Sequence, residues 1–368
     1  MRTLMIGAVV ASTALVAVAA TTPAGASQGP RAPHKAKFKV IAKGLNNPRQ
    51  LNFSKSGKLY IAEAGAGGTS DCRTGAEGGP VCWGPSGSVT VVSHGKQHRV
   101  ITGLPSYGDQ NSGTTALGPA DVVPYGKHRL AVSVGYGFAP KDRASLAAPG
   151  RLFGRLLGYN LKNGHRTTLG DLLRFEGRKN PIHDPNTDPT GIFKWGRTWY
   201  ATDSGGNDLV RVRHHKVRLV KVFHDVKVPG GKAQAVPTDV VVGPDGALYV
   251  CELTGFPFVK GAASIYRIAP GHHRAKVYAS GLTNVTSIAF GKDGKLYAVQ
   301  IANKGLADPA GPVGSLWRVH SDKSGKKNRN LTGPLFAPYG VAIKGHNAYV
   351  SMNSVLPGAG SVIKVPLT

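Results

Sequence analysis

The chain has 368 residues and a formal net charge of +27, from 46 Lys and Arg residues against 19 Asp and Glu. This length exceeds what one simple hydrophobic core supports, which leaves two domains or a repeat architecture. The 50 glycines and 25 prolines, without any long segment of 3.6-residue periodicity, argue against long helices and are typical of a β protein with short strands. The charge favours anionic partners such as cell-envelope polymers, glycans or, non-specifically, nucleic acid.

The N-terminal segment has the pattern of a secretory signal. Arg2 is followed by the apolar run "LMIGAVVASTALVAVAA", and Ala24-Gly25-Ala26 forms a small-residue cleavage site. A membrane anchor is the alternative, but it would need about 20 apolar residues without that small-residue exit. The sequence therefore predicts a signal peptide at residues 1–26, a basic linker at residues 27–36, and a secreted mature chain without a transmembrane segment.

One pattern recurs along the rest of the chain. In "AVPTDVVVGPDGALYVCELTGFPF", residues 235–258, an apolar run, a Gly turn and a second apolar run ending in an acid follow one another. Six copies occur, and their marker residues lie 70, 70, 49, 48 and 52 residues apart: Tyr60, Leu130, Tyr200, Tyr249, Tyr297 and Tyr349. β-Hairpins repeated about every 50 residues indicate propeller blades. We therefore predict an all-β, six-bladed β-propeller of four-stranded antiparallel blades over residues 37–368.

Cysteines lie only near the first and fourth copies. Cys72 and Cys82 belong to a Gly-rich loop that offers no further Cys or His for a metal, so we predict that they form a disulfide. Cys251 lies inside an apolar run and is interpreted as a small buried core residue.

The last copy lacks a fourth strand, because the sequence stops after its third. The run "FKVIAKGL" at residues 38–45 has the pattern of a fourth strand but precedes the first copy. We predict that it pairs with residues 361–367, which would close the ring and remove exposed sheet edges.

Three stretches carry a resemblance to a known family: "VPTDVVVGPDGALYVCELTGFPF", "LNNPRQLNFSKSGKLYIAEAG" and "GRLFGRLLG". On these residues the chain resembles the ScyD/ScyE family of exported six-bladed β-propellers and, more distantly, NHL-repeat propellers. The resemblance extends from about Val40 to the end of the sequence. It implies the propeller fold and export, and no particular activity.

Basic residues concentrate in two classes of turn. The turns between first and second strands and between third and fourth strands lie on one face of such a propeller. The predicted polyanion-binding face includes Lys55, Lys58, Lys127, Arg129, Lys216, Arg218, Lys326 and Lys327. The only acids assigned to it are Asp245, Asp293 and Asp322. The alternative, polar turns in a Lys-rich protein, explains the total charge but not its segregation to one face.

Five acids occupy repeat-equivalent positions, and we predict that they surround the axis at the channel mouth on the opposite face. They are Glu63, Asp121, Asp203, Asp239 and Glu252. Converging carboxylates suit Ca²⁺ or another divalent cation, so this is the predicted ligand or metal site. The alternative is that backbone amides donate to these acids, which would then fix the innermost strands.

These features favour an exported, monomeric binding or scaffold protein rather than an enzyme. Its basic face would contact anionic cell-envelope polymers or glycans, and its channel mouth would take a small ligand or cation. No HExxH, GxSxG, GxxxxGK[ST] or CxxC motif occurs. The alternative is a metal-dependent hydrolase or lactonase that uses axial carboxylates, followed by a quinoprotein-type sugar oxidoreductase. Carboxylates within metal-ligand distance would favour the hydrolase, and strand-fixing hydrogen bonds would favour the binding protein.

Overall fold

β-Strands dominate the computed structural model, which describes residues 38–75, 78–180 and 182–367. The expected signal peptide, and the linker that follows it, lie outside these residues. Within the described ranges, no helix combines the length and apolar character needed to cross a membrane.

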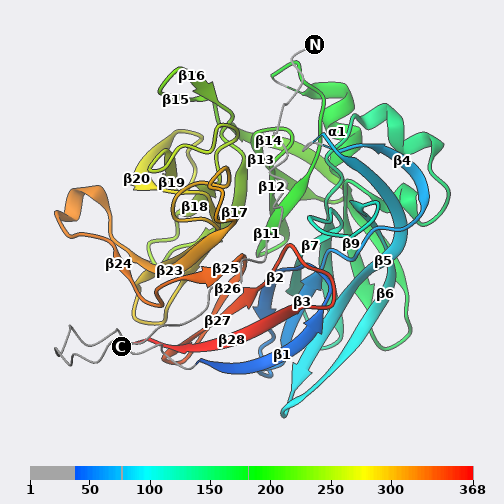
Figure 1. The fold of residues 1–368 in the computed structure, drawn as a ribbon, viewed down its shortest axis with the longest axis horizontal. Coiled ribbons are helices and arrows are strands. Elements are labelled where there is room, and N and C mark those ends of the chain that lie inside the picture. Colours follow the sequence, from blue (N-terminus) through cyan, green and yellow to red (C-terminus); the bar gives the residue numbers. More distant parts are fainter. Residues whose placement is uncertain (1–37, 76–77, 181, 368) are drawn as a thin grey trace, which may run out of the picture.

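The described strands form six sheets of four or five antiparallel strands around a common centre (Figure 1). Sheet 1 contains β2 (Pro48–Phe53), β3 (Leu59–Glu63), β4 (Ser70–Thr74), β5 (Pro80–Ser93) and β6 (Lys96–Asp109). Sheet 2 contains β7 (Pro119–Pro124), β8 (Arg129–Val134), β9 (Arg155–Asn160) and β10 (Arg166–Asp171). Sheet 3 contains β11 (Pro189–Trp195), β12 (Thr198–Asp203), β13 (Asp208–Arg213) and β14 (Lys216–Val222).

The other three sheets repeat this order. Sheet 4 contains β17 (Pro237–Val242), β18 (Leu248–Glu252), β19 (Ala263–Ile268) and β20 (Ala275–Leu282). Sheet 5 contains β21 (Val285–Phe290), β22 (Leu296–Gln300), β23 (Val313–Val319), β24 (Arg329–Asn330) and β25 (Leu335–Phe336). Sheet 6 contains β26 (Val341–Lys344), β27 (Asn347–Met352), β28 (Gly360–Pro366) and β1 (Lys39–Leu45).

The N-terminal strand pairs with the C-terminal strand, as the sequence predicts. β1 runs antiparallel to β28, with Lys39 opposite Lys364 and Leu45 opposite Gly360. In Figure 1 the blue β1 lies beside the red β28. The pairing satisfies an edge of β28 that would otherwise present unpaired backbone groups.

The hydrophobic core is divided among the spaces between successive sheets. One cluster joins sheets 1 and 2, and others join 2 and 3, 3 and 4, 4 and 5, 5 and 6, and 6 and 1. The first strands contact each other in the same cyclic order, from β2 through β7, β11, β17, β21 and β26 back to β2. Because every sheet packs on two neighbours, second strands such as β3, β18 and β22 are buried along their whole length. These features are those of a β-propeller.

The predicted disulfide between Cys72 and Cys82 is present, and Cys251 is a free, buried cysteine. The loop around the disulfide has no strand pattern in the sequence, but the structure has β4 paired with the start of β5 there. This hairpin extends sheet 1 outward. Its polar, exposed β4 has no hydrophobic alternation that would reveal a strand.

Helical elements are few among the described residues. They are α1 (Leu172–Lys179) and the 3₁₀ turns Pro140–Ser145, Gly150–Leu152 and Asp322–Ser324. The loop after sheet 3 contains a small hairpin, β15 (Val226–Val228) with β16 (Gly231–Ala233). The short α1 begins after Asp171, whose side chain accepts a hydrogen bond from the backbone N–H of Arg174 as an N-cap.

Candidate functional site

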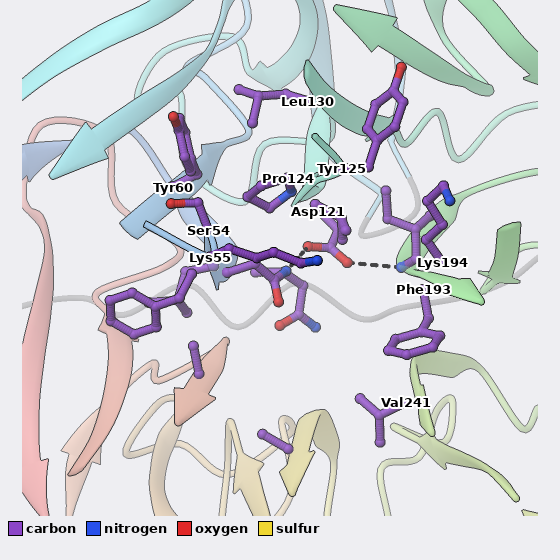
Figure 2. A pocket seen from close by; sticks show the side chains of 18 of the residues that line it. Ser54, Lys55, Tyr60, Asp121, Pro124, Tyr125, Leu130, Phe193, Lys194 and Val241 are labelled. Atoms are coloured by element: carbon purple, nitrogen blue, oxygen red, sulfur yellow. Dashed lines mark hydrogen bonds between the residues drawn. The ribbon is translucent and has the colours of Figure 1, made fainter. Parts of the chain in front are cut away.

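An axial cavity of about 1050 Å³ lies where the first strands of the six sheets meet. Its walls come from β2, β7, β11, β17, β21 and β26. Turn residues after β2, β7 and β11 also line it, so the cavity opens towards the basic turns (Figure 2). This volume is typical of a ligand pocket.

Side chains from four sheets line the inner end of the cavity. They are Gln50, Asp121, Asp239 and Ser287. Each lies at an irregularity in the pairing of the first and second strands, between Pro119 and Asp121 in sheet 2 for example. Such bulges re-aim a side chain, and here they occur where the chain enters each first strand.

Glycines occupy the equivalent positions in the other two sheets. A Cβ on Gly191 would lie 2.6 Å from the Cα of Asp239, and one on Gly340 would lie 2.6 Å from the carbonyl oxygen of Arg49. The strands therefore approach too closely at this level for any larger residue. The packing here, together with burial of Gln50, closes the inner end of the cavity.

Both axial carboxylates fix neighbouring strands to one another. Asp121 Oδ2 accepts a hydrogen bond from the backbone N–H of Ile192 in the next sheet (2.8 Å), and its Oδ1 accepts one from Asn52 Nδ2 (2.9 Å). Asp239 Oδ2 accepts one from the backbone N–H of Ile288 (2.9 Å), again in the next sheet. These contacts match the alternative stated above, in which backbone amides donate to the acids and the acids fix the innermost strands.

Burial dominates the electrostatics of this pair. It raises the pKa of Asp121 well above its ordinary value, with the charge of Asp239 adding to the effect and the backbone N–H bonds opposing it. Burial also raises the pKa of Asp239 to about 6. The two groups are thus poorly suited to being charged together, because like charges in a buried space disfavour ionisation.

The outer part of the cavity is basic. Lys55, Lys58, Lys127 and Arg129 are exposed and line it, and the half-buried Lys194 joins them. Figure 2 shows Lys55 and Lys194. Within the described residues, none of these five forms an ion pair. Lys194 Nζ donates a hydrogen bond to the carbonyl oxygen of Gly196 and lies 5.9 Å from the centre of the Trp199 ring, but no acid in the described part of the chain neutralises it or the other four.

The remaining predicted basic residues lie at the same ends of the sheets. Register places the β11–β12 and β13–β14 turns together, since Trp195 pairs with Thr198 and Arg213 with Lys216. Lys216 and Arg218 lie at this end of sheet 3. Lys326 and Lys327 lie between β23 and β24 at the corresponding end of sheet 5, where Phe290 pairs with Leu296 and Arg318 with Arg329. All four are exposed and do not line the cavity. The three acids assigned to this face are all engaged, as Asp245 pairs with Arg267 (2.7 Å), Asp293 with Lys295 (2.8 Å), and Asp322 accepts from Ser280 (2.9 Å).

The structure does not bring the five predicted acids together. Asp121 and Asp239 line the axial cavity, which opens towards the basic turns rather than the opposite face. Glu63, Asp203 and Glu252 do not line it. Across residues 38–75, 78–180 and 182–367, no group of three or more His, Cys, Asp and Glu side chains is placed to hold a metal ion.

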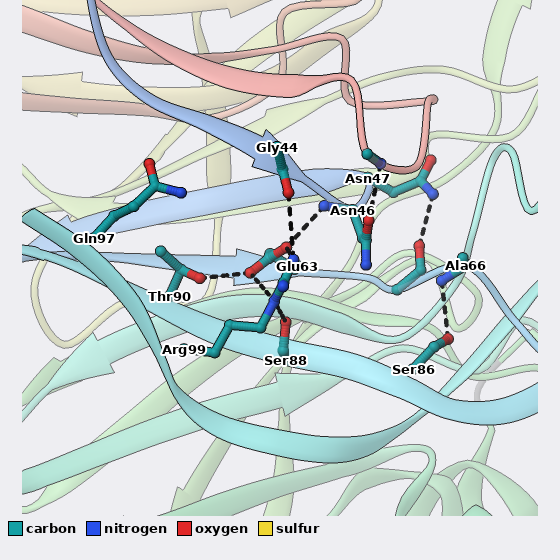
Figure 3. Close-up of polar contacts among 12 residues, drawn as sticks. Gly44, Asn46, Asn47, Glu63, Ala66, Ser86, Ser88, Thr90, Gln97 and Arg99 are labelled. Carbon is teal, nitrogen blue, oxygen red and sulfur yellow. Dashed lines mark hydrogen bonds and ion pairs between the residues drawn. The ribbon is translucent and has the colours of Figure 1, made fainter.

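Glu63 lies between strands of sheet 1, fully buried (Figure 3). Its carboxylate accepts hydrogen bonds from the Thr90 hydroxyl (2.6 Å) and the backbone N–H of Asn46 (2.7 Å). The Arg99 guanidinium bonds both of its oxygens, through Nε at 3.1 Å and through a terminal nitrogen at 2.8 Å. Glu63 therefore joins β3 and β6 to the chain entering β2.

Asp203 occupies the corresponding place in sheet 3. It accepts hydrogen bonds from the Thr187 hydroxyl and from the backbone N–H groups of Asp188, Gly205 and Gly206. These contacts join the end of β12 to the loop before β11 and to the turn before β13. Repeat equivalence located these acids along the second strands but did not show which way their side chains point.

Glu252 in sheet 4 is buried, and its carboxyl group accepts only two hydrogen bonds among the described residues. Its Oε1 accepts bonds from the Ser264 N–H (3.1 Å) and the Tyr266 hydroxyl (3.3 Å), and its Oε2 has no partner among the described residues. Burial raises the pKa of Glu252 to about 8, although the bond from Tyr266 opposes the shift.

This pKa predicts a pH-dependent stability. A carboxyl group whose pKa is raised by folding stabilises the native state below its unfolded pKa, and this contribution is lost as the pH rises through the folded value. For Glu252 the loss should span pH 4.5 to about 8. We expect the melting temperature of Glu252→Gln, relative to the unaltered chain, to increase between pH 5 and pH 9. A difference that is the same at both pH values would contradict the assignment.

Sequence reasoning missed Asn52 and Lys194 as cavity residues, and it did not assign a site role to Gln50 or Ser287. Gln50 and Ser287 hold the same repeat positions as Asp121 and Asp239, so the repeat alignment contained that signal. Lys194 belongs to a turn already recognised as basic. What the sequence lacked was evidence that this turn borders the axis.

No protein-family model and no curated protein matches the chain. A protein of unknown function from Bacteroides thetaiotaomicron is similar with a TM-score of 0.52 and 13% identity, over 89% of this chain and 75% of that one. Regucalcin from Agrobacterium tumefaciens, described as a calcium-binding protein, gives 0.50 and 11% over 90% and 94%. Virginiamycin B lyase from Staphylococcus aureus gives 0.48 and 12% over 90% and 99%. The similarity concerns the propeller fold alone.

Proposed function

We propose that this chain is an exported binding protein that holds an anionic polymer of the cell envelope, with one segment of the polymer in the axial cavity. One observation carries the proposal. The cavity of about 1050 Å³ has five unpaired cationic side chains in its outer part, and its only lining carboxylates among the described residues are Asp121 and Asp239 at the inner end. Its outer part therefore suits anionic groups, and its inner end offers hydrogen-bonding side chains.

The rest of the basic face extends this site. Lys216, Arg218, Lys326 and Lys327 project from turns at the same ends of the sheets, where the acids are already paired or hydrogen-bonded. A positive electrostatic potential over a cleft attracts polyanions, and the salt concentration sets the distance over which it acts. A polymer that spans several turns would collect more of these charges than a small anion.

We also infer the finer architecture on which this proposal depends: six blades in one closed ring, secreted after removal of residues 1–26. Six core clusters between successive sheets, the cyclic contacts of the first strands and the β1–β28 pairing support the ring. The Cys72–Cys82 disulfide is consistent with export, because such bonds persist in oxidising compartments. Membership of the ScyD/ScyE family remains a prediction of the sequence.

The hydrolase or lactonase alternative would require the axial acids to act on a substrate or a metal ion. Asp121 and Asp239 would first have to release the N–H groups of Ile192 and Ile288, which fix the first strands. No specific observation in the site favours that alternative over binding.

Neutralising the cavity mouth should weaken polyanion binding. In a triple variant with Lys55, Lys127 and Lys194 replaced by Gln, we expect the affinity for a sulfated polysaccharide at 0.1 M salt to fall at least roughly tenfold, with the slope of log affinity against log salt reduced by about three. Equilibrium binding across a salt series measures both quantities.

The matched control replaces three exposed lysines outside the basic turns that likewise form no ion pair among the described residues, namely Lys141, Lys227 and Lys260. Both variants lose three charges, so only their location differs. Equal weakening by the two variants would show that total charge alone governs binding. Equal affinity for duplex DNA and the polysaccharide would show non-specific polyanion binding instead of recognition of an envelope polymer.

A further inference from the structure

A second feature lies away from the axis, around the turn between β12 and β13. Asp203 and Asp208 stand directly opposite each other in the register of these strands. Side chains at such positions lie on the same face of a sheet, with Cβ atoms about 5 Å apart. Glu176 approaches the same turn from α1, since a Cβ on Gly206 would lie 3.0 and 3.1 Å from its two carboxylate oxygens.

The turn has space for oxygen atoms because it contains two glycines. A Cβ on Gly205 would lie 2.9 Å from Oδ1 of Asn186, in the loop before β11. Four oxygen-bearing side chains thus surround Gly205 and Gly206. They are Glu176, Asn186, Asp203 and Asp208.

Several of these oxygens have no partner among the described residues. Glu176 Oε1, both carboxylate oxygens of Asp208 and Asn186 Oδ1 accept no hydrogen bond. Asp208 is 0% exposed and Glu176 is 1% exposed. Buried oxygens without donors are rare in native proteins, and each one calls for a donor, a water molecule or an ion.

No cationic side chain among the described residues neutralises the three carboxylates. No Lys or Arg there forms an ion pair with Glu176, Asp203 or Asp208, although the whole chain carries a charge of +27. Asp203 is satisfied by its hydroxyl and backbone N–H donors. Glu176 and Asp208 have no such set of donors, and a buried carboxylate is costly unless it takes up a proton or meets a counter-charge.

We propose that this space is a binding site for a hard divalent cation of the Ca²⁺ class, with Glu176, Asp208 and Asn186 as side-chain ligands and Asp203 as the residue that shapes the turn. Two carboxylates and one amide supply four oxygen ligands: Glu176 Oε1, the two oxygens of Asp208 and Asn186 Oδ1. With only two acidic ligands, this set differs from the groups of three or more His, Cys, Asp or Glu side chains that the described residues do not contain. Ca²⁺ takes six to eight oxygens in flexible geometry and accepts carboxylate, amide and water oxygens together. Water completes the coordination.

A second pocket lies beside the β12–β13 turn. It has a volume of about 520 Å³, and Asn207, the neighbour of Asp208, is part of its wall. The wall also includes Ile182, His183 and Asp184, from the loop that leads to Asn186. A cation in the site would join α1, this loop and the start of β13, and it would offset the repulsion between the carboxylates of Glu176 and Asp208.

The experiment measures Ca²⁺ and Mg²⁺ binding to the secreted, metal-stripped chain by equilibrium dialysis with elemental analysis, and the melting temperature with and without each ion. We expect one bound Ca²⁺ per chain. At a hundredfold excess over the dissociation constant, the ion should raise the melting temperature by about 3 °C or more, because it binds the native state only.

Two isosteric variants, Asp208→Asn and Glu176→Gln, remove one ligand charge each. Both should bind Ca²⁺ at least tenfold more weakly and lose the thermal shift. Without metal they should melt at or above the unaltered chain, since each relieves a buried repulsion. Gly206→Ala retains every carboxylate but fills the space, and it should also weaken binding at least tenfold.

Glu252→Gln is the matched control, because Glu252 is another buried acid with an unpartnered oxygen, in sheet 4. It should retain full Ca²⁺ binding, and so should Asp121→Asn at the axis. Absence of stoichiometric binding of either ion overturns the proposal, as does unchanged binding in folded Asp208→Asn. Loss of binding in the axial variant alone would place the cation at the axis and would also overturn it.

Discussion

A mature chain that begins at residue 47, and so lacks β1, should lose its cooperative unfolding transition or be destabilised by at least about 5 kcal/mol. β1 supplies one complete edge of sheet 6 through its antiparallel pairing with β28. It also buries Ala42 and Leu45 in the cluster that joins sheets 6 and 1, where Leu51 and Val362 pack. Removing β1 exposes that cluster and leaves β28 with an unpaired edge.

The control is a chain that begins at residue 38 and keeps all of β1. It should melt like the longer secreted chain, because it retains the β1–β28 pairing. Adding a synthetic peptide of residues 38–46 to the truncated chain should restore part of the transition, since an exposed sheet edge accepts a strand. A truncated chain that melts like the control would show that β1 is dispensable and that the ring does not depend on it.

The second large effect is expected at the ion pair of sheet 1 in which a half-exposed arginine, Arg99, contacts a buried carboxylate, Glu63. Arg99→Met should lower the free energy of unfolding by about 3 kcal/mol or more, because it leaves the fully buried Glu63 carboxylate without its counter-charge. Chemical denaturation of the two proteins at one pH measures the difference. The double variant Glu63→Gln with Arg99→Met removes both charges and should recover much of the loss.

Arg267→Met serves as the comparison. Arg267 contacts Asp245 at 2.7 Å, close to the 2.8 Å of Arg99 and Glu63, and the two arginines are similarly exposed, at 35% and 41%. The pairs differ in the carboxylate, since Asp245 is 38% exposed and Glu63 is fully buried. Exposed pairs contribute at most about 1 kcal/mol, so this variant should be nearly neutral. Equal losses in the two single variants would show that burial of Glu63 is not what makes its pair important.

Much of the fold follows from local pattern. The spacing of markers such as Tyr249 and Tyr297 identified the paired strands, because a hairpin with a Gly turn is specified by residues close in sequence. The same pattern identified the strand at residues 38–45 and its partner at the end of the sequence. The disulfide of Cys72 with Cys82 was predicted on other grounds, because no further Cys or His lies nearby to complete a metal site. The sequence analysis did not predict α1, because eight residues are too few to show a helical periodicity.

Only part of the functional surface could be predicted from the sequence. Basic turns could be assigned to one end of the sheets from connectivity, because an antiparallel strand order fixes which turns lie together. That the turns after β2, β7 and β11 border a cavity at the axis could not be read from the sequence. Only the packing of six sheets around a centre brings Lys55, Lys127 and Lys194 to one opening.

The sequence by itself determined where each acid lies along its strand, and tertiary structure decided what each acid faces. Asp121 and Asp239 turn towards the axis because bulges interrupt the alternation of their strands, whereas Glu63 and Glu252 turn into their own sheets. Side chains alternate with a period of two, so a shift of one residue in register reverses a side chain without changing the repeat. Such shifts depend on contacts between strands far apart in the chain.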